Sequence, residues 1–355
     1  MYLSTKFISK KSREEKRHLL ITLGLTLFFF TCAGPEIKKE VELVWPLPPD
    51  EPRIKYLRTY ESSKDVEEEK VGEKLLSALL GESELGMGLS KPYGVFANRE
   101  VVIVTDTGLG RAVVFDLKNR NFFHIGTEGK GILAKPVGVA MDREGNIYIS
   151  DTQQDRVVVY DRRGNYLRVI GEKGTFLQPA GIAVNDKLNR VYVVDVNRHQ
   201  VLIFEKNGRL IKEIGKRGSG DGEFNYPTNI FVAPNGKIYV SDSMNFRVQI
   251  FDTEGNFIGK FGRVGDAPGM FSRPKGIGVD SEGHIYVVDA AFNNVQIFTE
   301  KGELLLFFGE MGHKPGQFWL PAGLYIDEDD KIYVADQYNK RVNVFQYLKT
   351  KNTGP

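Results

Sequence analysis

Short apolar runs alternate with polar turns along residues 91–348, and one run in each period ends in an aspartate. The six copies of that run are VIVTD (102–106), IYISD (147–151), VYVVD (191–195), IYVSD (238–242), IYVVD (285–289) and IYVAD (332–336). Successive aspartates lie 44 to 47 residues apart, a period typical of propellers and solenoids. The pattern therefore predicts one structural unit copied six times.

Each copy has the same predicted order of four strands. A Pro-x-Gly step opens an apolar run such as PVGVAM (136–141), and the run that ends in Asp follows. A four-residue turn leads to a third run such as RVVVY (156–160), and a Gly turn leads to a fourth such as YLRVIG (166–171). In the fourth copy Asn229 replaces the Gly. The runs are rich in Val, Ile, Phe and Tyr, which favour strands, and they are apolar on both faces, as expected of blades packed between neighbours.

The ends of the repeat region predict how the ring closes. The sixth copy stops after its third run, RVNVFQYLK (341–349), and RIKYLRTY (53–60) stands before the first copy and has the character of a fourth strand. We expect this N-terminal strand to complete the last blade, because closure removes exposed sheet edges. The predicted fold is all-β, a six-bladed β-propeller over residues 53–349 with a tail at 350–355.

One segment, residues 63–85, does not repeat. Val71, Leu75 and Leu79 fall at helical spacing, and Gly81 is a suitable helix stop, so we expect a short amphipathic helical insert. It either packs across a face of the propeller or contacts a partner or membrane. We favour packing because a short isolated helix needs contacts to be stable.

Residues 1–34 have the character of a targeting segment. A basic stretch precedes an uncharged apolar run, Leu19 to Phe30, which is too short to span a bilayer and matches the core of a signal peptide. The single cysteine, Cys32, follows this run, so FFTC (29–32) resembles the lipobox of bacterial lipoproteins, although Phe29 and Thr31 depart from that pattern. Lipidation of Cys32 is the favoured interpretation. The alternatives are cleavage elsewhere or an uncleaved anchor.

Residues 35–52 contain five prolines and predict an extended tether between the anchor and the propeller, with Trp45 as the residue that would pin the tether to the domain. The rest of the composition is that of a folded protein, with 41% hydrophobic and 26% charged residues. The net charge of +2 gives no electrostatic case for a nucleic-acid partner. With one cysteine, no disulfide can form within the chain.

The recurring pattern P-x-G-[IV]…[IV]-Y-[VI]-x-D…R-V-x-[IV]-F resembles the NHL repeat, in six copies over residues 91–348. Combined with the lipobox, the stretch WPLPPDEPR (45–53) and the insert, the chain is similar to a group of bacterial envelope propeller proteins. The resemblance implies a six-bladed fold and an exported, membrane-anchored protein that faces the periplasm or the cell exterior. It implies no reaction.

The six repeat aspartates could form a ring of carboxylates that binds a cation. In four copies, however, an Arg stands five residues after the Asp, across a tight turn, which favours structural pairs. These pairs are Asp106 with Arg111, Asp151 with Arg156, Asp242 with Arg247, and Asp336 with Arg341. Asp195 and Asp289 have Gln200 and Asn294 in the Arg position, so these two carboxylates are the better ligand candidates.

The loops between the second and third strands share one face with the loops that enter each blade. Mixed basic and aromatic residues there suit a protein or small-molecule partner. The candidate residues on this face are Asp195, Arg198, His199, Phe246, Asp289, Phe292, Trp319, Tyr338 and Lys340.

We expect no metal and no cofactor, because the five histidines do not converge and no catalytic motif appears. The predicted function is a monomeric binding or scaffold module, tethered by a lipid anchor, for an envelope protein or a small ligand. The alternative is a propeller hydrolase or lyase with carboxylates and calcium at the central channel. An intracellular RNA-binding propeller is a third hypothesis, which export would exclude.

Overall fold

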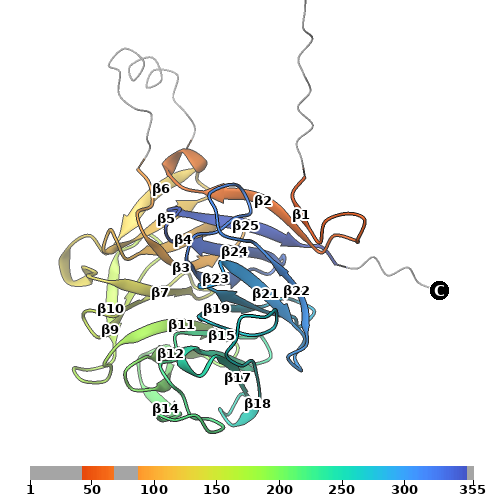
Figure 1. Cartoon of the computed structure of the whole chain (residues 1–355). Coiled ribbons are helices and arrows are strands. Elements are labelled where there is room, and N and C mark those ends of the chain that lie inside the picture. The colour runs from red at the N-terminus through yellow and green to blue at the C-terminus, as the bar shows by residue number, and fades with distance from the viewer. Residues whose placement is uncertain (1–41, 68–86, 350–355) are drawn as a thin grey trace, which may run out of the picture. The chain divides into compact units, whose positions relative to one another are not determined.

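The computed structural model describes residues 42–67 and 87–349, which form a closed ring of six antiparallel blades (Figure 1). Blade 1 consists of β3 (Pro92–Ala97), β4 (Val101–Asp106), β5 (Arg111–Asp116) and β6 (Asn121–Ile125). Blade 2 consists of β7 (Pro136–Met141), β8 (Ile147–Asp151), β9 (Arg156–Tyr160) and β10 (Tyr166–Ile170). Blade 3 consists of β11 (Pro179–Asn185), β12 (Arg190–Asp195), β13 (Gln200–Glu205) and β14 (Leu210–Ile214).

The second half of the ring follows the same plan. Blade 4 consists of β15 (Asn229–Val232), β16 (Ile238–Asp242), β17 (Arg247–Phe251) and β18 (Phe257–Phe261). Blade 5 consists of β19 (Pro274–Val279), β20 (Ile285–Asp289), β21 (Asn294–Phe298) and β22 (Leu304–Phe308). Blade 6 consists of β23 (Pro321–Ile326), β24 (Lys331–Asp336), β25 (Arg341–Tyr347), β2 (Ile54–Tyr60) and β1 (Val44–Trp45). The predicted six-bladed all-β fold is confirmed.

The first strand of each blade is innermost and contacts the first strands of the two neighbouring blades, from β3 round to β23 and back to β3. The middle strands are buried on both faces, as the doubly apolar runs predicted. Phenylalanines from the loops that enter blades 3 to 6 fill the space between blades and are almost fully buried; they are Phe176, Phe224, Phe271 and Phe318. The core is therefore a series of clusters between adjacent blades, with no single centre.

The ring closes with strands from both ends of the described chain, as predicted. Strand β2 pairs antiparallel with β25, with Ile54 opposite Tyr347. The Pro-rich segment differs from the expected free tether, because its residues Val44 and Trp45 pair with β2 as a fifth strand. The Trp45 ring lies 5.8 Å from the ring of Phe308, which confirms that Trp45 pins this segment to the propeller. The extended conformation of this segment suits strand pairing, and apolar contacts of the indole hold it against the propeller.

The described residues contain three single-turn 3₁₀ segments, η1 (Ser63–Asp65), η2 (Gly129–Gly131) and η3 (Ser243–Asn245). Of the predicted insert at 63–85, only η1 and its neighbours fall within the described ranges. The rest of the insert, the targeting segment 1–34 with Cys32, and the tail 350–355 lie outside them. Over the described ranges, no helix has the length and apolar character to cross a membrane.

Candidate functional site

All six repeat aspartates are fully buried on the loop-face side of the blades. The loop face is the end of the propeller formed by the turns between second and third strands together with the loops that enter each blade. The carboxylate of Asp106 accepts backbone N–H groups from Ser90 and Lys91, which lead into the blade, and from Gly108 and Leu109 in the turn. These bonds fasten the entering loop to the turn. The bond from the entering loop recurs in every blade, and the turn N–H bonds recur in blades 2, 3 and 5, whereas Asn245 and Asn339 side chains replace them in blades 4 and 6.

Asp195 and Asp289, the two expected ligand candidates, have the same role. Asp195 accepts the N–H groups of Leu177, Gln178 and Arg198. Asp289 accepts the N–H groups of Ser272, Arg273, Ala291 and Phe292. The structure therefore does not bring these carboxylates to the loop-face surface, because backbone donors that would otherwise be unsatisfied occupy their oxygens.

Two of the four predicted Asp–Arg pairs form ion pairs in the structure. The Nε atom of Arg247 lies 2.8 Å from Asp242, and that of Arg341 lies 3.0 Å from Asp336. In blades 1 and 2 the Asp and Arg face each other across the strands without an ion pair. Arg156 instead donates to the carbonyl oxygens of Lys130 and Ile132. Backbone N–H groups from the turn already use the carboxylates in those two blades.

Three of the other candidate residues on this face have structural surroundings. His199 is buried, its Nδ1 accepts the N–H of Tyr226, and burial lowers the pKa of its imidazole. Phe246 packs against the core between blades 4 and 5. Arg198 donates to Gln200 and to Glu213. These contacts position the loops of blades 3 and 4.

The remaining candidates are open to solvent. Trp319 and Tyr338 lie side by side, with their ring centroids 5.4 Å apart, and the imidazole of His313 meets the indole edge-on at 5.0 Å. Tyr338 is half exposed, and the Lys91 ammonium lies 5.8 Å from the centroid of its ring. Lys340 is exposed in the same turn as Tyr338, and Phe292 is partly exposed on blade 5. The structure thus brings Trp319 and Tyr338 together as an aromatic surface, with Lys340 in the turn of Tyr338 and Phe292 on the neighbouring blade.

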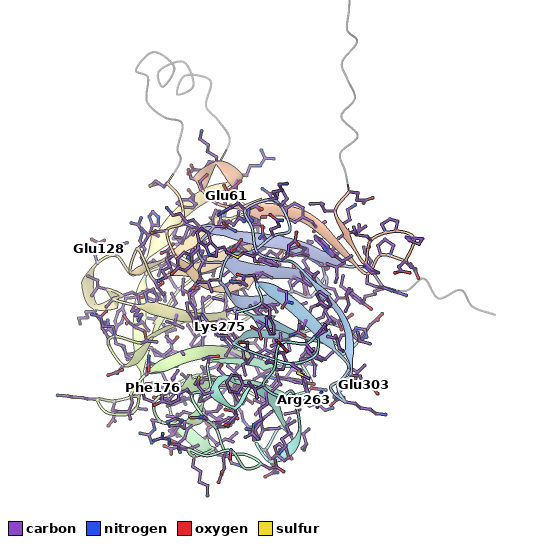
Figure 2. The ribbon with its side chains drawn as sticks, viewed as in Figure 1. Glu61, Glu128, Phe176, Arg263, Lys275 and Glu303 are labelled. Atoms are coloured by element: carbon purple, nitrogen blue, oxygen red, sulfur yellow. The ribbon has the colours of Figure 1, made fainter. Side chains whose placement is uncertain are left out.

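The sequence prediction missed Lys275, which lies inside the ring of blades while Glu128 and Glu303 lie at its rim (Figure 2). Its ammonium is 5.1 Å from the centroid of the Tyr93 ring. Blades 5 and 1, which carry these two residues, are not neighbours in the ring, because blade 6 lies between them. Lys275 follows the repeat proline of its blade, and it is the only charged residue among the six at this position. This difference from the other five copies could have marked Lys275 in the sequence.

Lys275 belongs to a basic group at the loop-face end of the central axis. We call Lys91, Arg273 and Lys275 the axial basic cluster. Within residues 42–67 and 87–349 none of these three side chains pairs with a carboxylate. Burial, and then the charges of Arg273 and Lys91, lower the pKa of Lys275 to about 8. An uncompensated, partly desolvated ammonium favours an anionic partner.

The opposite end of the axis holds a cavity of about 500 Å³ between the innermost strands. Its walls are mainly apolar, and its rim carries acidic residues from the turns between first and second strands. The rim carboxylates already have partners within the described structure. Asp280 accepts from His284 and Tyr286, Asp330 accepts from Ser281, and Glu328 pairs with Arg99. The carboxylates named here at the rim of this cavity are therefore already engaged in contacts within the protein.

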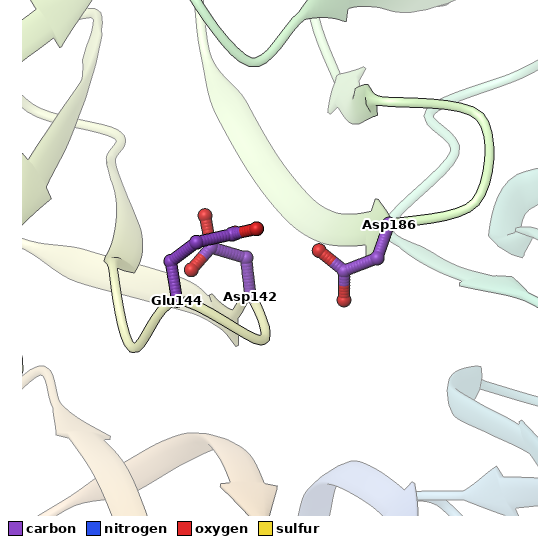
Figure 3. A group of neighbouring side chains, drawn as sticks. All are labelled: Asp142, Glu144 and Asp186. Atoms are coloured by element: carbon purple, nitrogen blue, oxygen red, sulfur yellow. The ribbon is translucent and has the colours of Figure 1, made fainter.

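Asp142, Glu144 and Asp186 form a compact group of three carboxylates at the same end (Figure 3). The ammonium of Lys206 contacts all three, at 3.5 Å from Asp142, 2.7 Å from Glu144, and closer still to Asp186. Burial opposes the charge of Lys206, but its hydrogen bonds to Asp186 and Glu144 outweigh burial and raise its pKa. The lysine supplies the positive charge that a calcium ion would bring, so these donors do not fit a metal site.

Comparison with known proteins agrees with this architecture. A family model described as a 6-bladed beta-propeller matches residues 178–235, 231–293 and 280–352. The chain is a six-bladed β-propeller. No curated protein matches it.

Several solved structures share the fold of this propeller. A protein of unknown function from Bacteroides thetaiotaomicron has a TM-score of 0.58 at 16% identity, with 83% of this chain and 75% of that chain covered. An auxiliary nutrient binding protein from the same organism has a TM-score of 0.58 at 14% identity, with 74% and 70% covered. Virginiamycin B lyase from Staphylococcus aureus has a TM-score of 0.55 at 14% identity, with 73% and 96% covered. At these identities the likeness concerns the fold alone.

Proposed function

We propose that this propeller is an exported, membrane-tethered binding or scaffold module of NHL-repeat type. It acts as a monomer and holds, on its loop face, an envelope protein or a small ligand that carries an anionic group. The observation that carries the proposal is the axial basic cluster, whose three cations have no carboxylate partner in the described structure. Of these, Lys275 lies beside Tyr93 and Lys91 beside Tyr338. Loops on a rigid scaffold are the usual place for such a site.

The contrast between the two ends of the axis supports binding at the loop face. At the opposite mouth the acidic residues already pair with Lys206, Arg99 and His284. A ligand there would have to break internal ion pairs, whereas an anion at the loop face would relieve the mutual repulsion of three cations. Binding at the loop face is therefore the less costly of the two.

The hydrogen bonds and ion pairs of the carboxylates favour a binding role over hydrolase or lyase activity. A general acid or base must reach the proton that it transfers. The repeat aspartates are buried with their oxygens bonded to backbone N–H groups, as at Asp195 and Asp289. The group around Asp142 is held by Lys206. These carboxylates serve the architecture, which leaves the enzymatic alternative without a supporting observation.

The binding proposal is tested by recovering ligands from an envelope extract with the full chain. Lys275→Met removes the charge at nearly constant length, and Lys187→Met, an exposed lysine at the opposite end, is the matched control. We expect mass spectrometry to identify the same anionic ligand with the wild type and with Lys187→Met, and to find it strongly depleted with Lys275→Met. Equal recovery with both variants would contradict the proposal.

Export and tethering are tested by intact mass and cell fractionation of the wild type and of Cys32→Ala. A diacylglyceryl-sized mass gain and membrane partition are expected for the wild type only, because the hydrocarbon chains provide the membrane affinity. Identical behaviour of the two proteins would leave Cys32 without a role in anchoring.

A further inference from the structure

In blade 4 a single arginine fills the space between the third strand and the loop that enters the blade. Arg247 pairs with Asp242 and also donates to three carbonyl oxygens of the loop, at 2.8 to 2.9 Å. These oxygens belong to Ser219, Gly220 and Glu223. The loop thus forms a cradle that fits a planar guanidinium, which offers five donors in a fixed geometry.

Blade 6 repeats this arrangement. Arg341 pairs with Asp336 and donates to three loop carbonyl oxygens, also at 2.8 to 2.9 Å. These oxygens belong to His313, Lys314 and Gln317, the counterparts of the blade 4 residues. Two blades therefore show the same site filled by the protein's own arginine.

Blade 5 has the same loop without the arginine. Asn294 stands in the arginine position, and the corresponding loop residues are Asp266, Ala267 and Met270. The loop keeps its shape, because the N–H of Met270 still bonds to Ala267, as the N–H of Glu223 does to Gly220 in blade 4. The shorter side chain leaves a pocket of about 220 Å³. It is lined by Asp266, Ala267, Pro268, Phe292, Asn294, Gln296 and Phe307.

The groups around this pocket favour a cation. The buried Oδ1 atom of Asn294 has no hydrogen-bond partner. Asp266 is exposed and makes no ion pair within the described ranges, and it stands where blades 4 and 6 have Ser219 and His313. The buried Asp289 lies opposite Asn294 on the neighbouring strand; backbone N–H groups bond to its oxygens, and it lacks the arginine partner of Asp242 and Asp336. The pocket therefore carries the negative charge of Asp266 and one free acceptor, the Oδ1 atom of Asn294, in the place where blades 4 and 6 carry a positive charge.

Two aromatic side chains add selectivity for a flat cation. In blades 4 and 6 an asparagine of the turn, Asn245 or Asn339, bonds to the repeat aspartate. In blade 5, Phe292 stands at this position. Phe307 is half exposed on the outer strand β22 and lines the same pocket. Guanidinium groups stack on aromatic rings, and they are more weakly hydrated than an ammonium.

We infer that the pocket beside Asn294 is a recess for a guanidinium group supplied by another molecule, in the place that arginine occupies in blades 4 and 6. The ligand class is an alkylguanidinium, either an arginine side chain of a polypeptide or a small guanidine. The inference goes beyond the proposed anion site, because it uses none of the axial basic cluster.

The test measures binding of N-acetylarginine amide to the full chain by calorimetry. The control ligand is N-acetylcitrulline amide, which has nearly the same shape and no charge. We expect saturable binding of the arginine compound and at least tenfold weaker binding of the citrulline compound. Agmatine, which has a guanidinium group but no peptide backbone, distinguishes the two possible ligands. An affinity for agmatine equal to that for N-acetylarginine amide indicates that the recess accepts any guanidine. A weaker affinity for agmatine indicates that the ligand is an arginine side chain of a polypeptide. Absence of discrimination between arginine and citrulline would overturn the inference.

Variants locate the site. Asn294→Arg should fill the recess from within, abolish binding of the arginine compound, and raise the melting temperature. Gln200→Arg adds an arginine at the corresponding position of blade 3 and should leave binding unchanged. Asp266→Asn removes the exposed carboxylate from the loop and should weaken binding about tenfold, which keeps the test open if Asn294→Arg does not fold. Lys275→Met should leave binding of the arginine compound unchanged. Undiminished binding in both Asn294→Arg and Asp266→Asn would refute the recess.

Discussion

The glycine of each Pro-x-Gly step is required by the close approach of neighbouring innermost strands. A Cβ atom on Gly94 would lie 2.2 Å from the carbonyl oxygen of Val137, and one on Gly138 would lie 2.2 Å from that of Ala180. Only a residue without a side chain allows the backbones to meet this closely. In blade 4, Asn229 occupies this position, and its strand pairs in regular register, whereas the other five innermost strands shift register after the proline.

Gly94→Ala should destabilise the propeller by about 1–3 kcal/mol, because the added methyl group overlaps a backbone oxygen that cannot move without shifting blade 2. The matched control is Gly259→Ala on strand β18, where a Cβ meets nothing within 4 Å. The measurement is the free energy of unfolding from urea titration. If Gly94→Ala lowers the free energy of unfolding no more than Gly259→Ala does, the innermost strands are not tightly packed at Gly94.

Lys275 gives the protein a pH dependence near pH 8. Because its folded-state pKa of about 8 lies below the ordinary value of lysine, the charged form is disfavoured in the fold. That destabilisation is fully present below pH 8 and is relieved as pH rises from 8 toward the ordinary pKa. Anion binding at the loop face should weaken over the same rise, because the ammonium loses its proton.

NMR of ¹³C-dimethylated protein should show one lysine that titrates near pH 8 and is missing in Lys275→Met. The same substitution should raise the melting temperature at pH 7, by about 2 °C or more, since it removes a partly buried charge without a carboxylate partner. A lysine that titrates only above pH 10, or a lower melting temperature, would contradict this view of Lys275.

At the scale of the element, each blade is tied to its entering loop through the repeat aspartate, and blades 4 and 6 add an arginine that pairs with this aspartate and bonds to the loop. Arg247 and Arg341 are nearly buried, and each satisfies a carboxylate and three carbonyl oxygens. Removing such a partner leaves an unpaired buried carboxylate and unsatisfied acceptors. These arginines therefore hold the loops of the loop face in a fixed conformation.

Arg247→Met should cost about 3–5 kcal/mol of unfolding free energy, the usual effect of breaking a buried ion pair. The comparison is Arg99→Met, because Arg99 pairs with Asp329 and Glu328 at the exposed surface, where the loss of unfolding free energy should be much smaller. Chemical denaturation of both variants gives the two values. Similar losses would mean that Arg247 is not the main support of its loop.

At the scale of the whole molecule, closure of the ring joins strands that are far apart in the sequence. Strand β2 pairs with β25, and the fully buried Ile54 lies in the cluster between blades 5 and 6. Without this pairing, β25 would be an exposed, largely apolar edge. Strand β1 then covers part of the edge of β2, with Trp45 packed on Phe308 and Phe345.

Ile54→Asp should open this closure, because a carboxylate in the cluster would have no partner. The expected result is a loss of the single cooperative thermal transition and a tendency to aggregate. Lys55→Gln, one position further on strand β2, removes only a surface pair with Glu42 and should unfold like the wild type. Calorimetry and light scattering distinguish the two outcomes. A cooperative, soluble Ile54→Asp protein would show that the closing strand is dispensable.

The sequence by itself determined the number of blades, the order of strands and the closing strand. Each of these depends on short-range patterns of apolar residues, turns and a repeated aspartate. It also named Trp319 and Tyr338 among the candidates on the loop face, but it did not show that their rings lie side by side.

Only the tertiary structure decided which side chains reach solvent and which meet across the axis. The sequence favoured a structural role for the repeat aspartates and left Asp195 and Asp289 as ligand candidates, but it did not show that these carboxylates accept backbone N–H groups, because those partners come from the loop before the blade. Lys275 meets Tyr93 across an intervening blade, and the recess at Asn294 exists because a loop keeps its shape without its arginine. Such contacts join residues of different blades or of a strand and a distant loop, and the repeat pattern, which has the same form in every copy, carries no information about them.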